Sequence, residues 1–343
     1  MIIKKVFTLS VITLTVIILF ISWYYQTLHH PIELSGQAQG TSYHFKLVIN
    51  SRAIKQTDIE QAINISLAEL DSSLSNYRDD SAIARINQQE TSQWIYVSKE
   101  ILNLLIIAQE VYQKSSGCYD LTVKPLFDIW GFSRHQNRIP SSKEIEAVLP
   151  HIGMALIEID KNNLRIRKKD TQVKIDLSSI AQGYSVGVIA HLLEKMGITH
   201  YLVEIGGEML VKGHKANGDN WHIAVQTPTP LTQTIQKIIE IKQEQGLAIM
   251  TAGTYQNFFE LDGQSYSHII NPKTGQPINH HLRSVTVIHQ DPTWADAWDT
   301  ALLCMGEQAA MQIAEKEKLS VLLIYEENNQ LKEYSSSAFK DYQ

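Results

Sequence analysis

The segment that decides the fold is YLVEIGGEMLV, residues 201–211. Its two apolar runs, residues 201–205 and 209–211, are typical of short buried strands. Gly206 and Gly207 between them favour a tight turn or hairpin, because glycine adopts the positive φ angles that such turns require. No G-x-G-x-x-G motif opens a helix here, so the segment is not a dinucleotide-binding loop.

The flanking segments mix helices and strands without a strict alternation. A helix is expected from about Ser179 to Met196, closed by Gly197, and strands are expected at residues 222–226 and 235–241. We therefore predict the α+β class, with mixed, largely antiparallel sheets and packed helices, rather than a doubly wound sheet. No linker rich in Pro, Gly or Ser divides the soluble part, which we expect to be one compact unit of one or two lobes.

Other elements follow from periodicity and from helix-capping signals. Thr57 with Glu60, and Ser141 with Glu144, have the spacing of capping boxes, and Ser98 is a natural N-cap. Helices are expected after these residues and at residues 294–305 and up to 318. Strands are expected at residues 43–49, 156–160, 164–168, 173–175, 258–261, 266–270, 284–289 and 321–325.

Composition excludes several classes of protein. The chain has 343 residues, of which 44% are hydrophobic and 19% charged, a balance that disordered, collagen-like and coiled-coil proteins do not have. Its formal charge of −6 gives no general attraction to nucleic acid or to phosphate ligands. Two cysteines, Cys118 and Cys304, exclude a disulfide scaffold and a thiolate zinc cluster, and we expect both to be buried apolar side chains.

The N-terminus carries a membrane-targeting signal. Residues 6–25 contain no charge, follow Lys4 and Lys5, and end in aromatic residues. Twenty helical residues span roughly the 30 Å of a bilayer core. We predict an uncleaved transmembrane anchor in residues 1–30, with a cleaved signal peptide as the alternative, and a soluble domain at residues 31–343. That domain would lie on the extracytoplasmic, periplasmic side of the cytoplasmic (inner) membrane. Without the two lysines the exported part has 28 basic and 36 acidic residues, a formal charge of −8.

The segment from Asp176 to Tyr184 joins a strand end to a helix start. Asp176, Ser178 and Ser179 suit helix capping, and that structural role is favoured from this segment alone. The free N–H groups of a helix start also suit phosphate binding. Gly183 permits the close approach of a ligand or of another backbone segment.

A histidine stands where an alternating strand meets a rigid turn. His268 is followed by Asn271-Pro272 and Gly275. Such a histidine usually faces solvent or bonds the turn. The alternative role is proton transfer, since the unperturbed pKa of histidine is close to neutral.

The strongest chemical pattern lies on the helix expected at residues 294–305. Asp296 and Asp299 are three residues apart, and Asp296 and Thr300 four, so their oxygens share one side of the helix. Neighbouring carboxylates repel each other unless a cation or proton intervenes, and hard oxygen ligands suit Mg²⁺ or Ca²⁺. Capping of the helix start explains Asp296 alone but not the pair.

Together these patterns, in this order, resemble the ApbE family of FAD:protein FMN transferases. The resemblance extends over about residues 36–318 and rests on eight modest motifs. These are Gly40-Thr41, residues 74–78, Tyr119-Asp120-Leu121-Thr122 to Phe132, residues 176–184, Gly206-Gly207, residues 251–255, Ser267-His268 to Pro272, and Ala295-Asp296 to Thr300.

The resemblance implies a reaction and a set of site residues. FAD would be split at its pyrophosphate, FMN joined to a threonine or serine hydroxyl of a partner flavoprotein, and AMP released, with Mg²⁺ required. His268 would activate the acceptor hydroxyl. The metal would be held by Asp296, Asp299, Thr300 and the carbonyl of Ser179. The residues matching FAD contacts are Gln39, Tyr77, Asp120, Leu121, Thr122, Asp176, Gln182 and Ile270.

Two other functions remain open from the sequence. A Mg²⁺-dependent FAD pyrophosphatase would use water in place of the protein hydroxyl at the same site. A non-catalytic, membrane-attached FAD-binding protein would have no need of the acidic pair and Thr300.

Overall fold

The computed structural model describes residues 15–17, 30–51, 53–134, 136–229, 234–261 and 263–342. Its centre is an eight-stranded sheet in the order β1-β2-β6-β7-β10-β15-β16-β17. Each neighbouring pair in this sheet is antiparallel. The strands are β1 (His30–Ala38), β2 (Thr41–Ile49), β6 (His200–Ile205), β7 (Glu208–Lys212), β10 (Leu247–Gly253), β15 (Leu282–His289), β16 (Ser320–Glu327) and β17 (Gln330–Ser335). The predicted α+β class with largely antiparallel pairing is confirmed.

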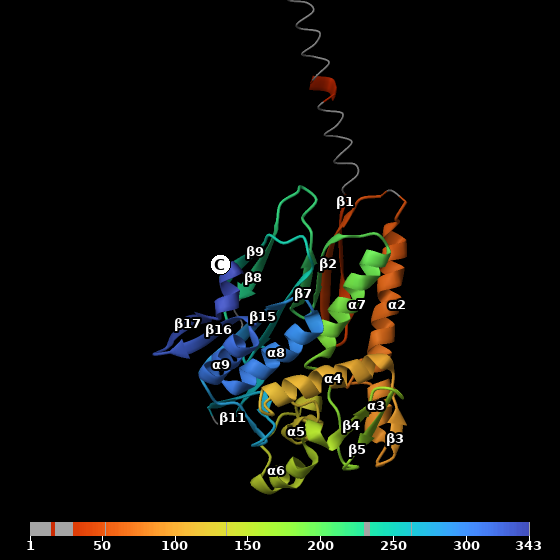
Figure 1. The fold of residues 1–343 in the computed structure, drawn as a ribbon. Helices are drawn as coiled ribbons and strands as arrows, with labels where there is room; N and C mark the ends of the chain where they lie inside the picture. The colour runs from red at the N-terminus through yellow and green to blue at the C-terminus, as the bar shows by residue number, and fades with distance from the viewer. Residues whose placement is uncertain are drawn as a thin grey trace, which may run out of the picture.

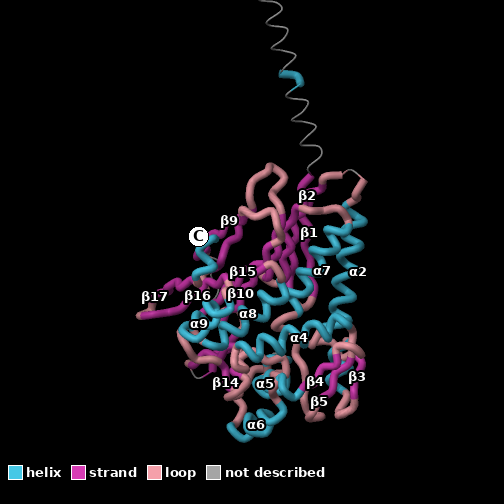
Figure 2. The backbone as a smooth tube through the Cα atoms, viewed as in Figure 1, coloured by secondary structure: helices cyan, strands magenta, loops and turns pink. Residues whose placement is uncertain are grey.

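Helices cover one face of this sheet (Figures 1 and 2). They are α2 (Gln56–Leu74), α4 (Lys99–Lys114), α7 (Ala181–Lys195), α8 (Pro292–Met305) and α9 (Glu307–Glu317). The hairpin of β8 (Trp221–Gln226) and β9 (Ile235–Ile241), with the 3-10 helix Ser337–Tyr342, packs on the other face. Alternate residues divide between the two cores: Leu210 packs on the helical side, whereas Val211 packs under the β8–β9 hairpin.

A second lobe lies below α4 in Figure 1. It contains α3 (Ala82–Gln88), α5 (Lys124–Trp130), α6 (Ser142–Val148) and the strands β3 (Trp94–Tyr96), β4 (Ile157–Asp160) and β5 (Arg165–Lys168), together with 3-10 turns at Phe132–Arg134, Leu149–His151 and Met154–Leu156. The small hairpins β11 (Phe258–Leu261) with β12 (Gln264–Ser267), and β13 (Ile270–Asn271) with β14 (Gln276–Pro277), adjoin α5 through Trp130 and Tyr266.

Most of the expected elements are present, with three corrections. Ser98 caps α4 and the Ser141/Glu144 capping box opens α6, as predicted. The Thr57/Glu60 box is wrong, because the N-cap of α2 is Lys55, two residues before Thr57, and it makes no side-chain cap bond. Residues 173–175 form no strand; this extended stretch instead bonds the Asn87 side chain. The strand expected at residues 266–270 is divided between β12 and β13, with His268 between them.

The predicted membrane anchor, residues 1–30, lies outside the described residues except for a helical stretch at residues 15–17 and for His30, the first residue of β1. Within the described part of the chain, no helix has both the length and the apolar character needed to cross a membrane.

Candidate active site

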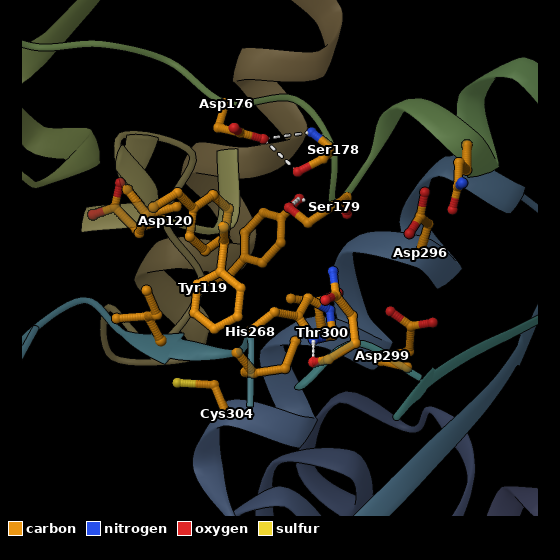
Figure 3. Close-up of a pocket in the computed structure, with 18 of the residues that line it drawn as sticks. Tyr119, Asp120, Asp176, Ser178, Ser179, His268, Asp296, Asp299, Thr300 and Cys304 are labelled. Atoms are coloured by element: carbon orange, nitrogen blue, oxygen red, sulfur yellow. Dashed lines mark hydrogen bonds between the residues drawn. The ribbon is translucent and has the colours of Figure 1, made fainter. Parts of the chain in front are cut away.

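A cavity of about 250 Å³ opens where the sheet, α8 and the second lobe meet. Its wall is built from the segment before α7, the ends of β7 and β10, the stretch around β13, and α8 (Figure 3). Ten of the thirteen predicted site residues line it: Tyr77, Asp120, Asp176, Ser179, Gln182, His268, Ile270, Asp296, Asp299 and Thr300.

Helix α8 presents its polar side to this cavity, as the spacing predicted. Asp296 and Asp299 are buried, with 4% and 1% of their surface exposed. Capping does not explain Asp296, since Asp291 is the N-cap and accepts the N–H groups of Thr293 and Trp294. Helix capping therefore explains neither member of the acidic pair on this buried helix.

A third carboxylate joins this pair from the sheet. Glu208, the first residue of β7, places a carboxylate oxygen so that ligand atoms of Glu208, Asp296 and Asp299 all lie within 4.8 Å of one another. In the sequence alone, Glu208 stands out only as the residue that follows the Gly206-Gly207 turn. The signal that could have identified it is its place at the start of the strand. Glu208 lies two residues before Leu210, on the face of the strand where the core requires an apolar side chain.

The three carboxylates are poorly compensated by protein groups. Asp296 accepts a 2.6 Å bond from the Gly183 N–H, and Glu208 a 3.1 Å bond from the Thr251 N–H. Neither carboxylate oxygen of Asp299 has a hydrogen-bond partner among the described residues. Burial raises the pKa of Asp296 to about 7, and burial together with the neighbouring carboxylates raises the pKa values of Asp299 and Glu208 well above their usual range. An orphaned buried carboxylate beside two others suits a divalent cation with oxygen ligands.

Gly183 allows α7 to touch α8 at this point. A Cβ atom there would lie 2.4 Å from the Pro292 carbonyl oxygen and 2.6 Å from the Asp296 Cβ. The absence of a side chain at Gly183 thus allows α8 to pack closely on α7. The close approach of another backbone segment was one of the two roles expected for this glycine.

A hydrogen bond to a backbone carbonyl group fixes the orientation of the His268 ring. Its Nδ1 lies 2.8 Å from the Asn257 carbonyl oxygen. Because a carbonyl only accepts, Nδ1 carries the proton and Nε2 is left as an acceptor. Burial lowers the pKa of His268 below its usual 6.5, which keeps the ring neutral near pH 7. A neutral imidazole lining the cavity can therefore accept a proton.

Asp176 organises the segment that precedes α7. It accepts from the Ser178 backbone N–H at 2.9 Å and the Asn76 amide at 2.9 Å, and it also bonds the Ser178 hydroxyl. Burial raises its pKa. The nearby Ser179 carbonyl, a predicted metal ligand, accepts the Tyr119 hydroxyl at 3.1 Å. Asp176 therefore stabilises a turn before α7 and faces the cavity. The helix-capping interpretation of this segment is wrong, because Ile180 is the N-cap of α7 and no side chain bonds there.

Asp120 lies on the opposite side of the cavity from Asp296 and Asp299 in the view of Figure 3. Burial raises its pKa to about 6. Leu121 and Thr122 are fully buried, and neither is among the residues lining the cavity. Thr122 donates to Asp120 at 2.6 Å, so its position behind the wall supports the Asp120 carboxylate.

Gln39 lies in an adjoining cavity of about 90 Å³, which Tyr77 and Gln182 also line. The turn between β1 and β2 gives Gln39 a φ of 53°, and its amide donates to Ser185 at 2.6 Å. Gly206 in the β6–β7 turn, with φ 65°, leaves room for the Gln182 amide, which would lie 2.7 Å from a Cβ at that position. The predicted hairpin at Gly206-Gly207 is confirmed.

The chain is similar to proteins of one known family along most of its length. The model of the ApbE family matches residues 39–323. The chain belongs to the ApbE family. It is 37% identical over 313 residues to the FAD:protein FMN transferase of Vibrio cholerae, covering 91% of this chain and 92% of that relative. The corresponding protein of Salmonella typhimurium is 35% identical over 313 residues, covering 90% and 88%.

Solved structures of ApbE proteins share the fold. The flavin transferase ApbE from Vibrio cholerae superposes with a TM-score of 0.84 at 35% identity, over 92% of this chain and 100% of that one. The apo form of the Pseudomonas stutzeri flavinyl transferase ApbE gives a TM-score of 0.83 at 31% identity, over 92% and 97%.

The expectation for the cysteines of this ApbE-family chain was wrong. Cys118 and Cys304 form a disulfide, with Cα atoms 5.8 Å apart across 186 residues of sequence. Both line the cavity. The bond ties the segment carrying Tyr119 and Asp120 to the C-terminal end of α8.

Proposed function

We propose that this protein transfers the FMN part of FAD to a threonine or serine hydroxyl of a partner flavoprotein and releases AMP. The observation that supports this most is one cavity combining a neutral, accepting histidine with a buried, uncompensated acidic cluster. The names of the relatives in Vibrio cholerae and Salmonella typhimurium point to the same reaction.

The chemistry of the step assigns a proton acceptor to this chain. The acceptor oxygen forms a bond to the FMN phosphorus while the bond from that phosphorus to the bridging oxygen breaks. AMP leaves with the bridging oxygen. The Nε2 of His268 takes the hydroxyl proton, and the Asn257 carbonyl holds the ring in the required tautomer.

Asp296, Asp299 and Thr300, with the Ser179 carbonyl, would hold the Mg²⁺. The buried oxygens of Asp299, which have no hydrogen-bond partner among the described residues, and the burial of Asp296 fit that role because they leave negative charge for a cation to neutralise. When bound, Mg²⁺ would neutralise the pyrophosphate and stabilise the charge that develops on the phosphoryl oxygens. An acidic protein needs such a cation to bind an anionic substrate.

FAD would lie along the rest of the cavity. Tyr77, Asp120, Asp176 and Ile270 border it, and Gln39 and Gln182 border the adjoining cavity. Leu121 and Thr122 would act through the backbone and through Asp120.

The protein would work on the periplasmic side of the cytoplasmic membrane, attached by residues 1–30. The uncharged run after Lys4 and Lys5 supports this proposal. The Cys118–Cys304 bond supports it independently, because disulfides persist in oxidising compartments and are rare in the cytosol. Thiol alkylation in intact cells tests the location: both cysteines should resist the reagent, and two reactive thiols in the wild-type chain would contradict it.

The test of function mixes the full-length protein, FAD, Mg²⁺ and a flavoprotein that carries a candidate threonine. Intact mass of the flavoprotein should rise by the mass of an FMN group, and AMP should appear in equal amount. Free FMN and AMP with an unmodified flavoprotein would favour a pyrophosphatase. FAD binding without either product would favour a non-catalytic carrier.

A further inference from the structure

Glu208 lies on the helical face of the main sheet. Cross-strand pairing places Glu208 opposite Ile205, which belongs to the core under the helices, and Leu210 two residues on belongs to the same core. Glu208 therefore projects from the sheet toward α7 and α8. Only 7% of its surface is exposed.

Its single hydrogen bond does not account for a buried carboxylate. The Thr251 N–H reaches one oxygen at 3.1 Å, and a glutamine would accept that bond equally well. The two other carboxylates beside it make a negative charge at this position unfavourable in the protein alone. A group with positive charge would remove this conflict.

The geometry of the cluster fits one cation with ligands from two elements. Oxygens bound to Mg²⁺ at about 2.1 Å lie roughly 3.0–4.2 Å from one another, and those bound to Ca²⁺ at about 2.4 Å lie up to roughly 4.8 Å apart. The ligand atoms of Glu208, Asp296 and Asp299 lie within 4.8 Å of one another. Asp299, 1% exposed and with neither oxygen partnered among the described residues, points to a missing ligand independently of the cluster itself.

We infer that Glu208 is a further protein ligand of the divalent cation, joining the sheet to the metal-binding side of α8. The inference rests on the proposed function only in that the cation belongs to this site. Three carboxylates hold a cation more firmly than two, so the site binds its metal before FAD arrives. A pair on α8 alone would instead depend on substrate oxygens to retain the metal.

Titration of the full-length protein with MgCl₂ by calorimetry, without FAD, tests this inference. Glu208→Gln keeps the shape and the Thr251 bond but removes the charge, and it should weaken Mg²⁺ binding on the order of 10–100-fold. The matched control is Glu204→Gln. Glu204 lies on the same hairpin but on the opposite face, where it bonds His44 at 2.8 Å, so its variant should bind Mg²⁺ within about twofold of the wild type.

A thermal melt in EDTA controls for folding. Glu208→Gln should melt at or above the wild-type temperature, because a repelling charge has been removed. If it melts lower, the comparison passes to Glu208→Asp, which retains the charge and must then bind Mg²⁺ more tightly than Glu208→Gln; equal affinities would overturn the inference.

Wild-type affinity in a well-folded Glu208→Gln would overturn it as well, and so would a wild-type protein that binds Mg²⁺ only when FAD is present. Those results leave the transferase function standing, since the mass measurement on the flavoprotein decides that separately.

Discussion

Replacing Gly183 by alanine tests the close packing of α7 on α8 without changing any side chain that is proposed to touch substrate. The added Cβ would stand 2.4 Å from the Pro292 carbonyl oxygen and 2.6 Å from the Asp296 Cβ. Both contacts are far below van der Waals distance, and neither is the end of a flexible side chain. The two helices must therefore separate, and the 2.6 Å bond from the Gly183 N–H to Asp296 must lengthen.

The size of the effect follows from two opposing contributions. Overpacking of this kind costs about 1–3 kcal/mol. Alanine in a helix regains about 0.5–1 kcal/mol over glycine. The net loss is then roughly 0–2.5 kcal/mol. Its midpoint of about 1.3 kcal/mol lowers Tm by about 3–5 °C if each kcal/mol moves Tm about 2–4 °C in a chain of this order of size.

The assay is a thermal melt in EDTA and again in saturating Mg²⁺. Gly187→Ala is the matched control, one turn further along α7, because its Cβ would meet only the Pro292 ring, with the nearest atom at 2.9 Å. The Gly187→Ala contact is also closer than 3.0 Å but involves one ring carbon and no backbone atom, so we expect its Tm to fall less than that of Gly183→Ala. Only Gly183→Ala should also show a smaller gain in Tm from Mg²⁺. Equal melting curves for the two variants would refute the close-packing argument.

Four further changes follow from the same site. Asp299→Asn should raise the Tm in EDTA, since a buried unpartnered carboxylate is lost, yet abolish the gain in Tm from Mg²⁺; a lower Tm in EDTA would contradict the assignment. Raising the pH from about 4 to 7 should destabilise the metal-free protein and strengthen Mg²⁺ binding, because the folded pKa of Asp296 is raised to about 7 and the unfolded chain loses its proton first; melts with and without Mg²⁺ show both trends, and a flat profile would exclude the raised pKa. His268→Gln should slow FMN transfer about 10²–10⁴-fold with FAD affinity unchanged, and a loss confined to FAD binding would remove its role as a base. Cys118→Ser should cost about 2–5 kcal/mol of stability by opening the link to Cys304, and dithiothreitol should lower the Tm of the wild type but not of the variant; equal sensitivity to the reductant would contradict this account.

The sequence predicted those parts of the fold whose signals are local. Alternating apolar runs and the glycine turn identified β6, β7 and β8, and capping residues located the starts of α4 and α6. It missed β10, a nearly continuous apolar run in the middle of the sheet. Such a run is buried on both faces and has no period of two that would reveal a strand.

The same limit separates the site residues that could be predicted from those that could not. Asp296 and Asp299 lie on one helix, so helical spacing alone places them together. Glu208 and the disulfide become meaningful only when β7, the segment after α4 and the end of α8 meet in space. No local pattern brings together residues so far apart in the chain.

A buried acidic residue in a strand can nevertheless be recognised, because it occupies a position where the core requires an apolar side chain. On β7 the alternate positions on the helical side require apolar side chains, and Leu210 provides one, whereas Glu208 does not. A charged side chain at a core position destabilises the protein unless a partner of opposite charge compensates for it. Among the described residues no cation of the protein bonds Glu208, and its neighbours in the cluster are both acids. Either a bound proton or a cation from outside the chain must therefore neutralise Glu208. Mg²⁺ titration of the Glu208 variants distinguishes the two.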